Sequence, residues 1–196
     1  MRRFGVLVVL FLVYGCATYA IVGPRRVDVG AAYSVEPRLE WNKLEKRFVT
    51  GPMEIWTSDG RRMDTLFFFT GVDSGAPLFA GPVRGGQSSK RKDVPVFNAD
   101  MSATEIAELF EATLSRLTGS TLSEMTNLRP ATFAGVEGFR FDLAYTTRDQ
   151  LERRGFAVGA VKDEKLYMIF FQGTRIYHYG KHLKEVEHIV ASAKFL

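Results

Sequence analysis

Two segments of this chain are apolar at successive positions, and they constrain the fold more than any other feature. They are residues 66–69 and residues 166–171, the second of which lies within the segment KLYMIFFQ at 165–172. A half-exposed strand alternates apolar and polar side chains, whereas a strand covered on both faces does not. Both segments therefore predict central strands of a sheet that other elements cover on its two faces.

Turn residues between apolar segments predict that most strands are joined by hairpins. Three predicted pairs share this pattern: 53–57 with 63–70 across a turn at Ser58, Asp59 and Gly60, 120–128 with 139–146 across Gly135 and Gly138, and 156–161 with 165–172 across 162–164. Hairpins join antiparallel strands, so the sheet is expected to be antiparallel.

Two segments predict helices. Residues 102–117 start with Ser102 and Glu105 at the spacing of a capping box, carry an apolar stripe at intervals of three and four, and precede Gly119. Residues 181–194 have a second stripe, Leu183, Val186, Val190 and Ala193. The order of elements predicts an α+β domain in which an antiparallel sheet is packed by helices.

The remaining segments of this domain, expected to span residues 33–196, are less regular. Residues 33–44 predict an edge strand followed by a helical turn, and residues 71–99 predict a long loop with a solvated, flexible character. Within that loop, residues 81–88 have the spacing of a phosphate loop, but Gln87 stands where that motif needs lysine. We therefore expect no phosphate loop here.

The first residues resemble a bacterial lipoprotein signal peptide. Arg2 and Arg3 precede an uncharged apolar run at 4–13, which has the length of a signal-peptide core. Residues 13–16 read VYGC and are similar to a lipobox, and Cys16 is the chain's one cysteine. The resemblance implies that residues 1–15 are removed and that Cys16 is acylated, which would anchor the protein in a membrane, with residues 16–32 as a tether. Ala17, rather than aspartate, implies the outer membrane, with the inner membrane as the alternative.

Two other interpretations of this segment stay open. Residues 4–23 contain no charge and are long enough to cross a bilayer, although arginines on both sides give no asymmetry to orient the helix. An ordinary cleaved signal would leave Cys16 as a free thiol, which is a liability in an oxidising compartment.

Charge and cysteine content exclude several classes of protein. The formal net charge is +4, and it falls to +2 without Arg2 and Arg3, so we expect no nucleic acid partner. One cysteine excludes an internal disulfide and a zinc site built on cysteine pairs.

The histidines are the candidates for metal binding or acid/base catalysis, but their spacing supports this only weakly. His178 and His182 are four residues apart, a metal-ligand spacing on a helix, and Glu185 follows. Gly180 is expected to mark the start of the helix, however, and His188 is turned about 240° from His182. We therefore expect no metal, no cofactor and no catalytic residue. Six aromatic side chains are expected to pack in the core rather than line a pocket: Trp41, Trp56, Tyr145, Tyr167, Tyr177 and Tyr179.

The second half of the chain, from Ser102 onward, is similar to PsbP-like and DcrB-like proteins. The similarity is carried by GVEGFRF at 135–141, the KLYMIFFQ strand and the terminal HLKEVEHIVASAKF helix. It implies an α/β/α sandwich, in a group that includes bacterial lipoproteins with accessory roles. The expected function is a membrane-anchored lipoprotein whose non-catalytic, periplasm-facing domain serves binding, assembly or envelope maintenance, with an envelope protein as a possible partner.

Two alternatives to this function remain. The first is a lipid-anchored enzyme, which would need His178 or His182 beside Asp142, Asp149 or Glu185. The second is a carrier of a small ligand, which would need an apolar cavity with residues 71–99 as its lid.

Overall fold

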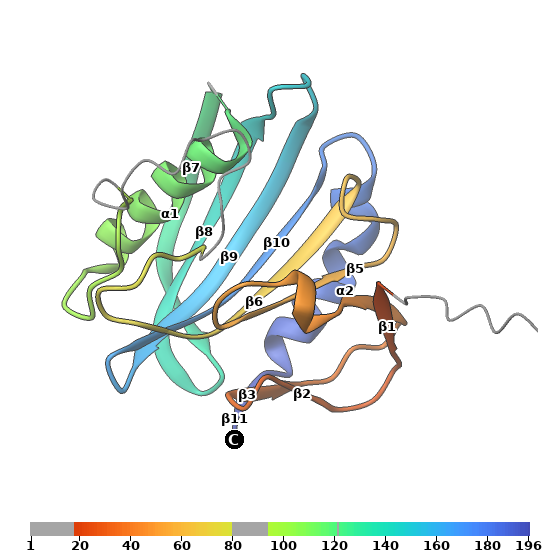
Figure 1. The fold of residues 1–196 in the computed structure, drawn as a ribbon, viewed down its shortest axis with the longest axis horizontal. Coiled ribbons are helices and arrows are strands. Elements are labelled where there is room, and N and C mark those ends of the chain that lie inside the picture. The colour runs from red at the N-terminus through yellow and green to blue at the C-terminus, as the bar shows by residue number, and fades with distance from the viewer. Residues whose placement is uncertain (1–17, 80–93, 121) are drawn as a thin grey trace, which may run out of the picture.

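An eight-stranded antiparallel sheet carries one helix on each face (Figure 1). The computed structural model describes residues 18–79, 94–120 and 122–196. The strand order is β1-β4-β5-β6-β10-β9-β8-β7. The strands are β1 (Tyr19–Val22), β4 (Trp41–Leu44), β5 (Met53–Thr57), β6 (Asp64–Asp73), β7 (Leu122–Phe133), β8 (Val136–Thr146), β9 (Glu152–Lys162) and β10 (Lys165–Thr174).

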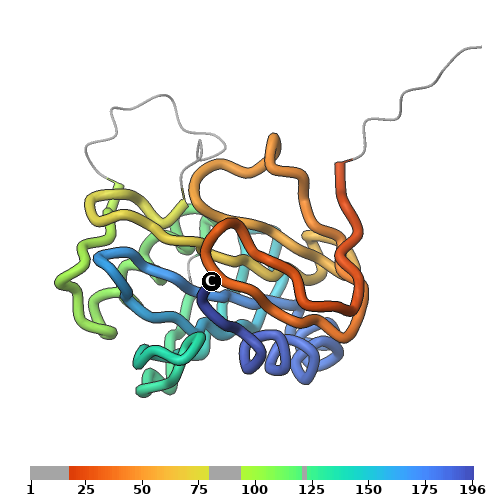
Figure 2. Tube along the Cα trace, turned by 90° about the horizontal axis from the view of Figure 1, so that it is seen from below, coloured from red at the N-terminus to blue at the C-terminus, as the bar shows by residue number. Residues whose placement is uncertain are grey.

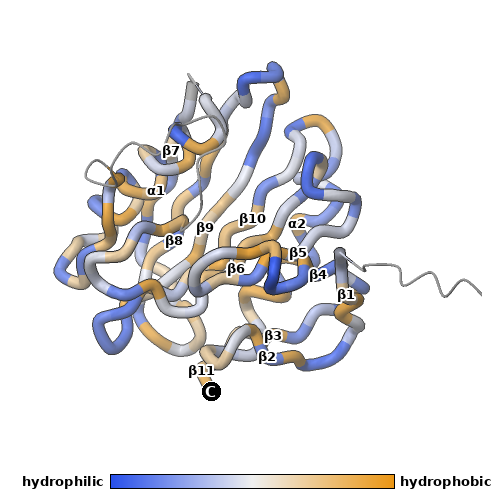
Figure 3. The backbone as a smooth tube through the Cα atoms, viewed as in Figure 1, coloured by the Kyte–Doolittle hydropathy of each residue, from blue (hydrophilic) through white to orange (hydrophobic). Residues whose placement is uncertain are grey.

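The central strands are covered on both sides, as the apolar runs predict. Phe67 and Phe69 of β6 pack toward helix α1 (Ala103–Thr118), and Leu66 and Phe68 pack toward helix α2 (His178–Ala191). Figure 2 shows α2 along one side of the sheet, and Figure 3 shows apolar residues concentrated on the central strands. The predicted α/β/α sandwich is confirmed. We call the two buried layers the α1-face core and the α2-face core.

The predicted hairpins form, and their strands β6, β7, β8, β9 and β10 extend beyond the predicted ranges. β5 pairs with β6 across residues 58–63, and β9 pairs with β10 across 163–164. β7 extends to Phe133 and turns tightly into β8 at Ala134 and Gly135, both with positive φ.

Helix α1 is confirmed with its capping box, since the Ser102 hydroxyl accepts a hydrogen bond from Glu105 N and the Glu105 carboxylate accepts one from Ser102 N. Gly119 ends the helix in the left-handed region, at φ 63°. Helix α2 starts at His178 rather than near Lys181, so the prediction that Gly180 marks its start is wrong. Gly180 lies in the first turn, where the Lys181 amide already donates to Tyr177 O.

The expectation of a tether over residues 16–32 is wrong for the part that the structure describes. β1 pairs with β4, and β2 (Val27–Val29) pairs with β3 (Tyr33–Val35) in a second sheet of order β11-β3-β2, where β11 is Lys194–Phe195. These strands are too short to show periodicity, and β4 and β11, which pair with β1 and β3, are distant from them along the chain. The domain therefore begins at β1 and not at residue 33, and residues 33–44 hold two strands, followed by the short helix η1 (Lys46–Phe48).

The expected loop at 71–99 is shorter than predicted at both ends. β6 continues to Asp73, and Phe97 is fully buried, with its amide bonded to Ala76 O. Residues 80–93, which include the segment resembling a phosphate loop, lie outside the described residues. So do the predicted signal peptide and Cys16. No helix in the described part of the chain is long and apolar enough to span a membrane.

Candidate site at the β5–β6 turn

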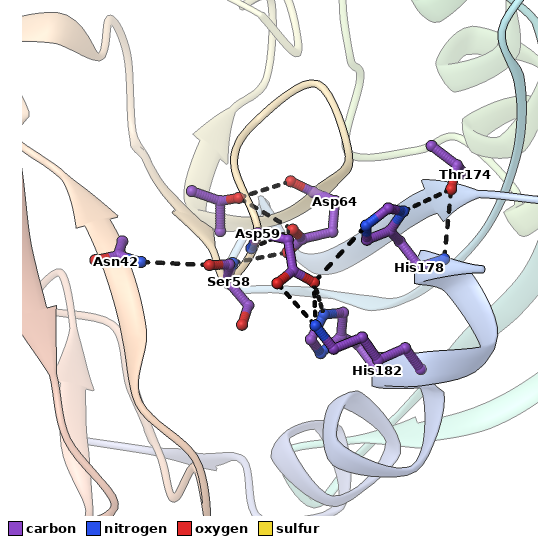
Figure 4. Close-up of polar contacts among 9 residues, drawn as sticks. Asn42, Ser58, Asp59, Asp64, Thr174, His178 and His182 are labelled. Atoms are coloured by element: carbon purple, nitrogen blue, oxygen red, sulfur yellow. Dashed lines mark hydrogen bonds and ion pairs between the residues drawn. The ribbon is translucent and has the colours of Figure 1, made fainter.

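Helix α2 directs two histidines and a lysine at one carboxylate of the β5–β6 turn (Figure 4). His182 Nε2 lies 2.7 Å from Asp59 Oδ2, and His178 Nε2 lies 3.9 Å from the same oxygen. Lys181 Nζ lies 2.6 Å from it. These side chains, with Asp64 and Thr174, are called the Asp59 cluster below.

Asp64 fixes the turn that presents Asp59. Its buried carboxylate accepts hydrogen bonds from the amides of Ser58 and Asp59, at 2.8 and 2.7 Å, and from the Thr57 hydroxyl at 3.2 Å. Because a buried carboxylate needs such donors, the turn and the first residue of β6 stabilise each other.

Charges within the cluster compensate one another. The hydrogen bond from Lys181 lowers the pKa of the Asp59 carboxyl, and His182 adds to this effect. The same bond raises the pKa of Lys181. The imidazole of His182 is buried, with its ring centre 5.6 Å from that of Trp41 in the α2-face core. The cluster therefore joins the turn to α2 by an ion pair and a partly buried hydrogen bond.

Thr174, His178 and Asp59 form a chain of hydroxyl, imidazole and carboxylate that superficially resembles a hydrolase triad. His178 Nδ1 lies 2.7 Å from Thr174 Oγ1, and this oxygen also accepts a hydrogen bond from His178 N at 3.4 Å. Thr174 is buried, and the contact from His178 to Asp59 is too long for a hydrogen bond. A nucleophile must be reachable by substrate, so this arrangement suits a cap on the first turn of α2.

Asp59, Asp64 and His182 are the group of described residues whose ligand atoms could hold a metal ion, since these atoms lie within 4.8 Å of one another. Their oxygens already have donors, however. Asp64 is bound by the turn amides, and the Lys181 ammonium supplies at Asp59 the positive charge that a cation would bring. The donor set fits an internal network better than a metal centre.

No hydrogen bond or ion pair joins His178 or His182 to the carboxylates that the enzyme alternative requires, those of Asp142, Asp149 and Glu185. The Asp142 carboxylate accepts from Asn127, that of Asp149 from Arg62, and that of Glu185 from the amides of Arg38 and Leu39. Sequence reasoning missed Asp59 as the histidines' partner because an aspartate before glycine is expected in any hairpin turn.

The aromatic residues singled out in the sequence are mostly core residues. Trp41, Trp56 and Tyr145 are buried, and Tyr167 and Tyr179 pack against the α2-face core. Tyr177 is exposed. The six side chains therefore do not form a common aromatic pocket.

Comparison with known proteins supports the fold alone. No family model matches the sequence, and neither does any curated protein. Among solved structures, the chain is similar to the solution structure of cyanobacterial PsbP (CyanoP) from Synechocystis sp. PCC 6803. The TM-score is 0.54 at 15% sequence identity, and the match covers 94% of this chain and 96% of the other. The PsbP-like fold thus extends over nearly the whole chain, beyond the half that carries the sequence resemblance.

Proposed function

We propose that this chain is a lipid-anchored protein of the bacterial cell envelope, whose PsbP-like domain acts by binding rather than by catalysis. The observation that carries the proposal is the position of Cys16. It is the chain's single cysteine, ends a segment similar to a lipobox, and stands three residues before β1. Acylation there would hold the domain on the membrane, and Ala17 favours the outer membrane over the inner one.

The short distance between Cys16 and β1 gives the anchored domain a definite orientation. Three extended residues span only about 10 Å, so the β1 edge of the sheet would lie at the membrane surface. β7 forms the opposite edge of the same sheet. An anchored domain would therefore direct β7, with α1 beside it, toward the periplasm and its partners (Figure 1).

A non-catalytic role is favoured by the Asp59 cluster. Its carboxylates are bonded to donors within the chain, and its one hydroxyl is buried behind the helix terminus. We therefore propose a binding or assembly role with an envelope protein as partner, and no nucleic acid.

Intact mass tests the anchor. The full chain is expressed in an export-competent bacterium, extracted from its membranes and compared with the variant Cys16→Ser. We expect loss of the first fifteen residues and a mass gain equal to the acyl chains, both absent in the variant. A full-length unmodified mass, or a trimmed and soluble product, would refute the anchor.

The orientation is tested with an environment-sensitive dye on introduced cysteines. Ile21→Cys lies on exposed β1 and Thr126→Cys on exposed β7, and an acylated Cys16 would leave each new thiol as the sole target. Lipid-borne quenchers should quench the dye at residue 21 and not at residue 126. Equal quenching at both positions would contradict the proposed orientation.

A further inference from the structure

A row of polar side chains interrupts the α1-face core where strands β8, β9 and β10 lie side by side. It consists of Tyr145, Arg153 and Gln172, which are 4%, 7% and 8% exposed. Tyr145 and Arg153 are direct partners in the β8–β9 ladder, and the Tyr145 hydroxyl donates to the Gln172 side-chain oxygen. Polar groups this deeply buried need a reason, since their desolvation is costly.

The charge of Arg153 has no counter-charge within the described part of the chain. Its Nη2 donates to Arg62 O, and its Nη1 has no hydrogen-bond partner among the described residues. Burial raises the pKa of the Tyr145 phenol, which therefore stays neutral beside it. A guanidinium is always charged, and a buried charge without a partner is destabilising.

Asp149, the acidic residue that borders the same hollow as Arg153, does not supply the counter-charge. The Asp149 carboxylate accepts from Arg62 Nη2 at 2.9 Å and from the Thr147 hydroxyl at 2.5 Å. It forms no ion pair with Arg153. The Arg153 guanidinium is therefore buried without a counter-charge among the described residues, while the Asp149 carboxylate is bonded to Arg62 and Thr147.

Arg153 borders a hollow of about 470 Å³, called the Arg153 hollow below. Its lining also includes Tyr145, Gln172, Thr118, Thr147, Arg148 and Asp149, whose carboxylate is bonded to Arg62 and Thr147. Arg148 is exposed and lies against Gly119 at the end of α1. The volume is in the range of small-molecule sites, and two arginines against one aspartate give the lining a net positive charge.

We propose that the Arg153 hollow binds a small oxyanion, a carboxylate or a phosphate. Arg153 supplies the buried positive charge, and Arg148 supplies a second guanidinium at the hollow. Tyr145 and Gln172, joined by their hydrogen bond, form part of the lining. A guanidinium presents two parallel donors to such anions, which suits this ligand class. The site goes beyond the proposed envelope role and does not depend on acylation of Cys16.

Thermal unfolding of the full chain in a non-ionic detergent tests the site. Inorganic phosphate and acetate are titrated separately at constant ionic strength, with chloride as the reference anion. We expect one of the two oxyanions to raise Tm in a saturable manner beyond chloride, and the more effective one identifies the ligand chemistry. Arg153→Gln should weaken the apparent affinity at least about 10-fold, as expected for loss of a charged hydrogen-bond partner.

A neighbouring residue provides the matched control. Arg154 follows on β9 but points to the other face of the sheet, so Arg154→Gln should leave the titration unchanged. If Arg153→Gln does not fold, the decision passes to Arg148→Gln, whose exposed side chain can be replaced without disturbing the core. That variant should weaken binding several-fold. The proposal is overturned if neither oxyanion raises Tm more than chloride does. It is also overturned if Arg153→Gln folds and its titration matches that of Arg154→Gln, or if Arg148→Gln, used in its place, matches Arg154→Gln.

Discussion

The β5–β6 turn touches two polar clusters, one on each side of the sheet, and the two differ in how their charges are balanced. On the α2 side, Asp59 accepts from Lys181 and His182, so the charges of the cluster are matched within the chain. On the α1 side, Arg62 offers only a backbone carbonyl to Arg153, whose guanidinium forms no ion pair in the described part of the chain. The matched charges join α2 to the turn, whereas the unmatched charge of Arg153 is the one that the proposed oxyanion would neutralise.

The strongest test of this comparison removes the carboxylate that orders the turn. Asp64→Ala deprives the backbone amides of Ser58 and Asp59 of their acceptor and leaves a gap at a buried position, so we expect the free energy of unfolding to fall by about 3 kcal/mol. Urea unfolding measures the change. Asp28→Ala, at an exposed strand position, is the control and should change stability by less than about 0.5 kcal/mol. Equal losses in both variants would show that Asp64 does not organise the turn.

The next largest effect is expected at the buried histidine. His182→Ala removes the hydrogen bond to Asp59 and the contact with Trp41, which should cost about 2 kcal/mol. His188→Ala, on the same helix but without a side-chain hydrogen bond among the described residues, should cost less than about 0.5 kcal/mol. The same unfolding experiment compares the two. A loss at residue 188 that matched the loss at 182 would contradict a specific role for the cluster.

Unlike Asp64 and His182, Arg153 is expected to contribute little to the free energy of unfolding. In a buffer with chloride as its only anion, Arg153→Gln should change stability by less than about 1 kcal/mol, because an unpaired buried charge contributes little to the fold. Its effect should instead appear when the bound oxyanion is present. A loss above about 2 kcal/mol without oxyanion would place Arg153 among the structural residues and remove the contrast between the clusters.

The smallest effect is the pH dependence of the Asp59 ion pair. Hydrogen bonding by Lys181 lowers the pKa of Asp59 from its ordinary 3.8, so this carboxylate stabilises the fold above that value and less as pH falls through the lowered pKa. The pKa of Lys181 is raised from 10.5, so its contribution is full below 10.5 and lost at higher pH.

The stability difference between the wild-type chain and Asp59→Asn should therefore shrink as the pH falls below about 4. Unfolding at a series of pH values measures it. A difference that is unchanged at about pH 3 would show that the ionised carboxylate is not what holds α2 to the turn.

Local sequence patterns predicted much of this fold because the interactions behind them are local. The capping box of α1 joins residues three apart, and the Asp-Gly turn lies between the two strands that it connects, β5 and β6. The double-sided apolar runs of β6 and β10 likewise required cover on both faces, which α1 and α2 supply.

The short strands and the Asp59 cluster could not be found in this way. β1 adds to the sheet through β4, from which it is separated by two strands of another sheet, and nothing in residues 19–22 indicates that partner. Asp59 and His182 are 123 residues apart. The spacing of the histidines is visible in the sequence, but the carboxylate that they contact belongs to a segment distant along the chain.

The sequence by itself thus determined the antiparallel sheet, its two helical layers and the position of the single cysteine. These follow from side-chain periodicity, turn chemistry and composition, which are properties of neighbouring residues. Only the tertiary structure decided which charges find partners. Charge balance depends on distances between distant segments, and that balance separates the Asp59 cluster from the Arg153 hollow.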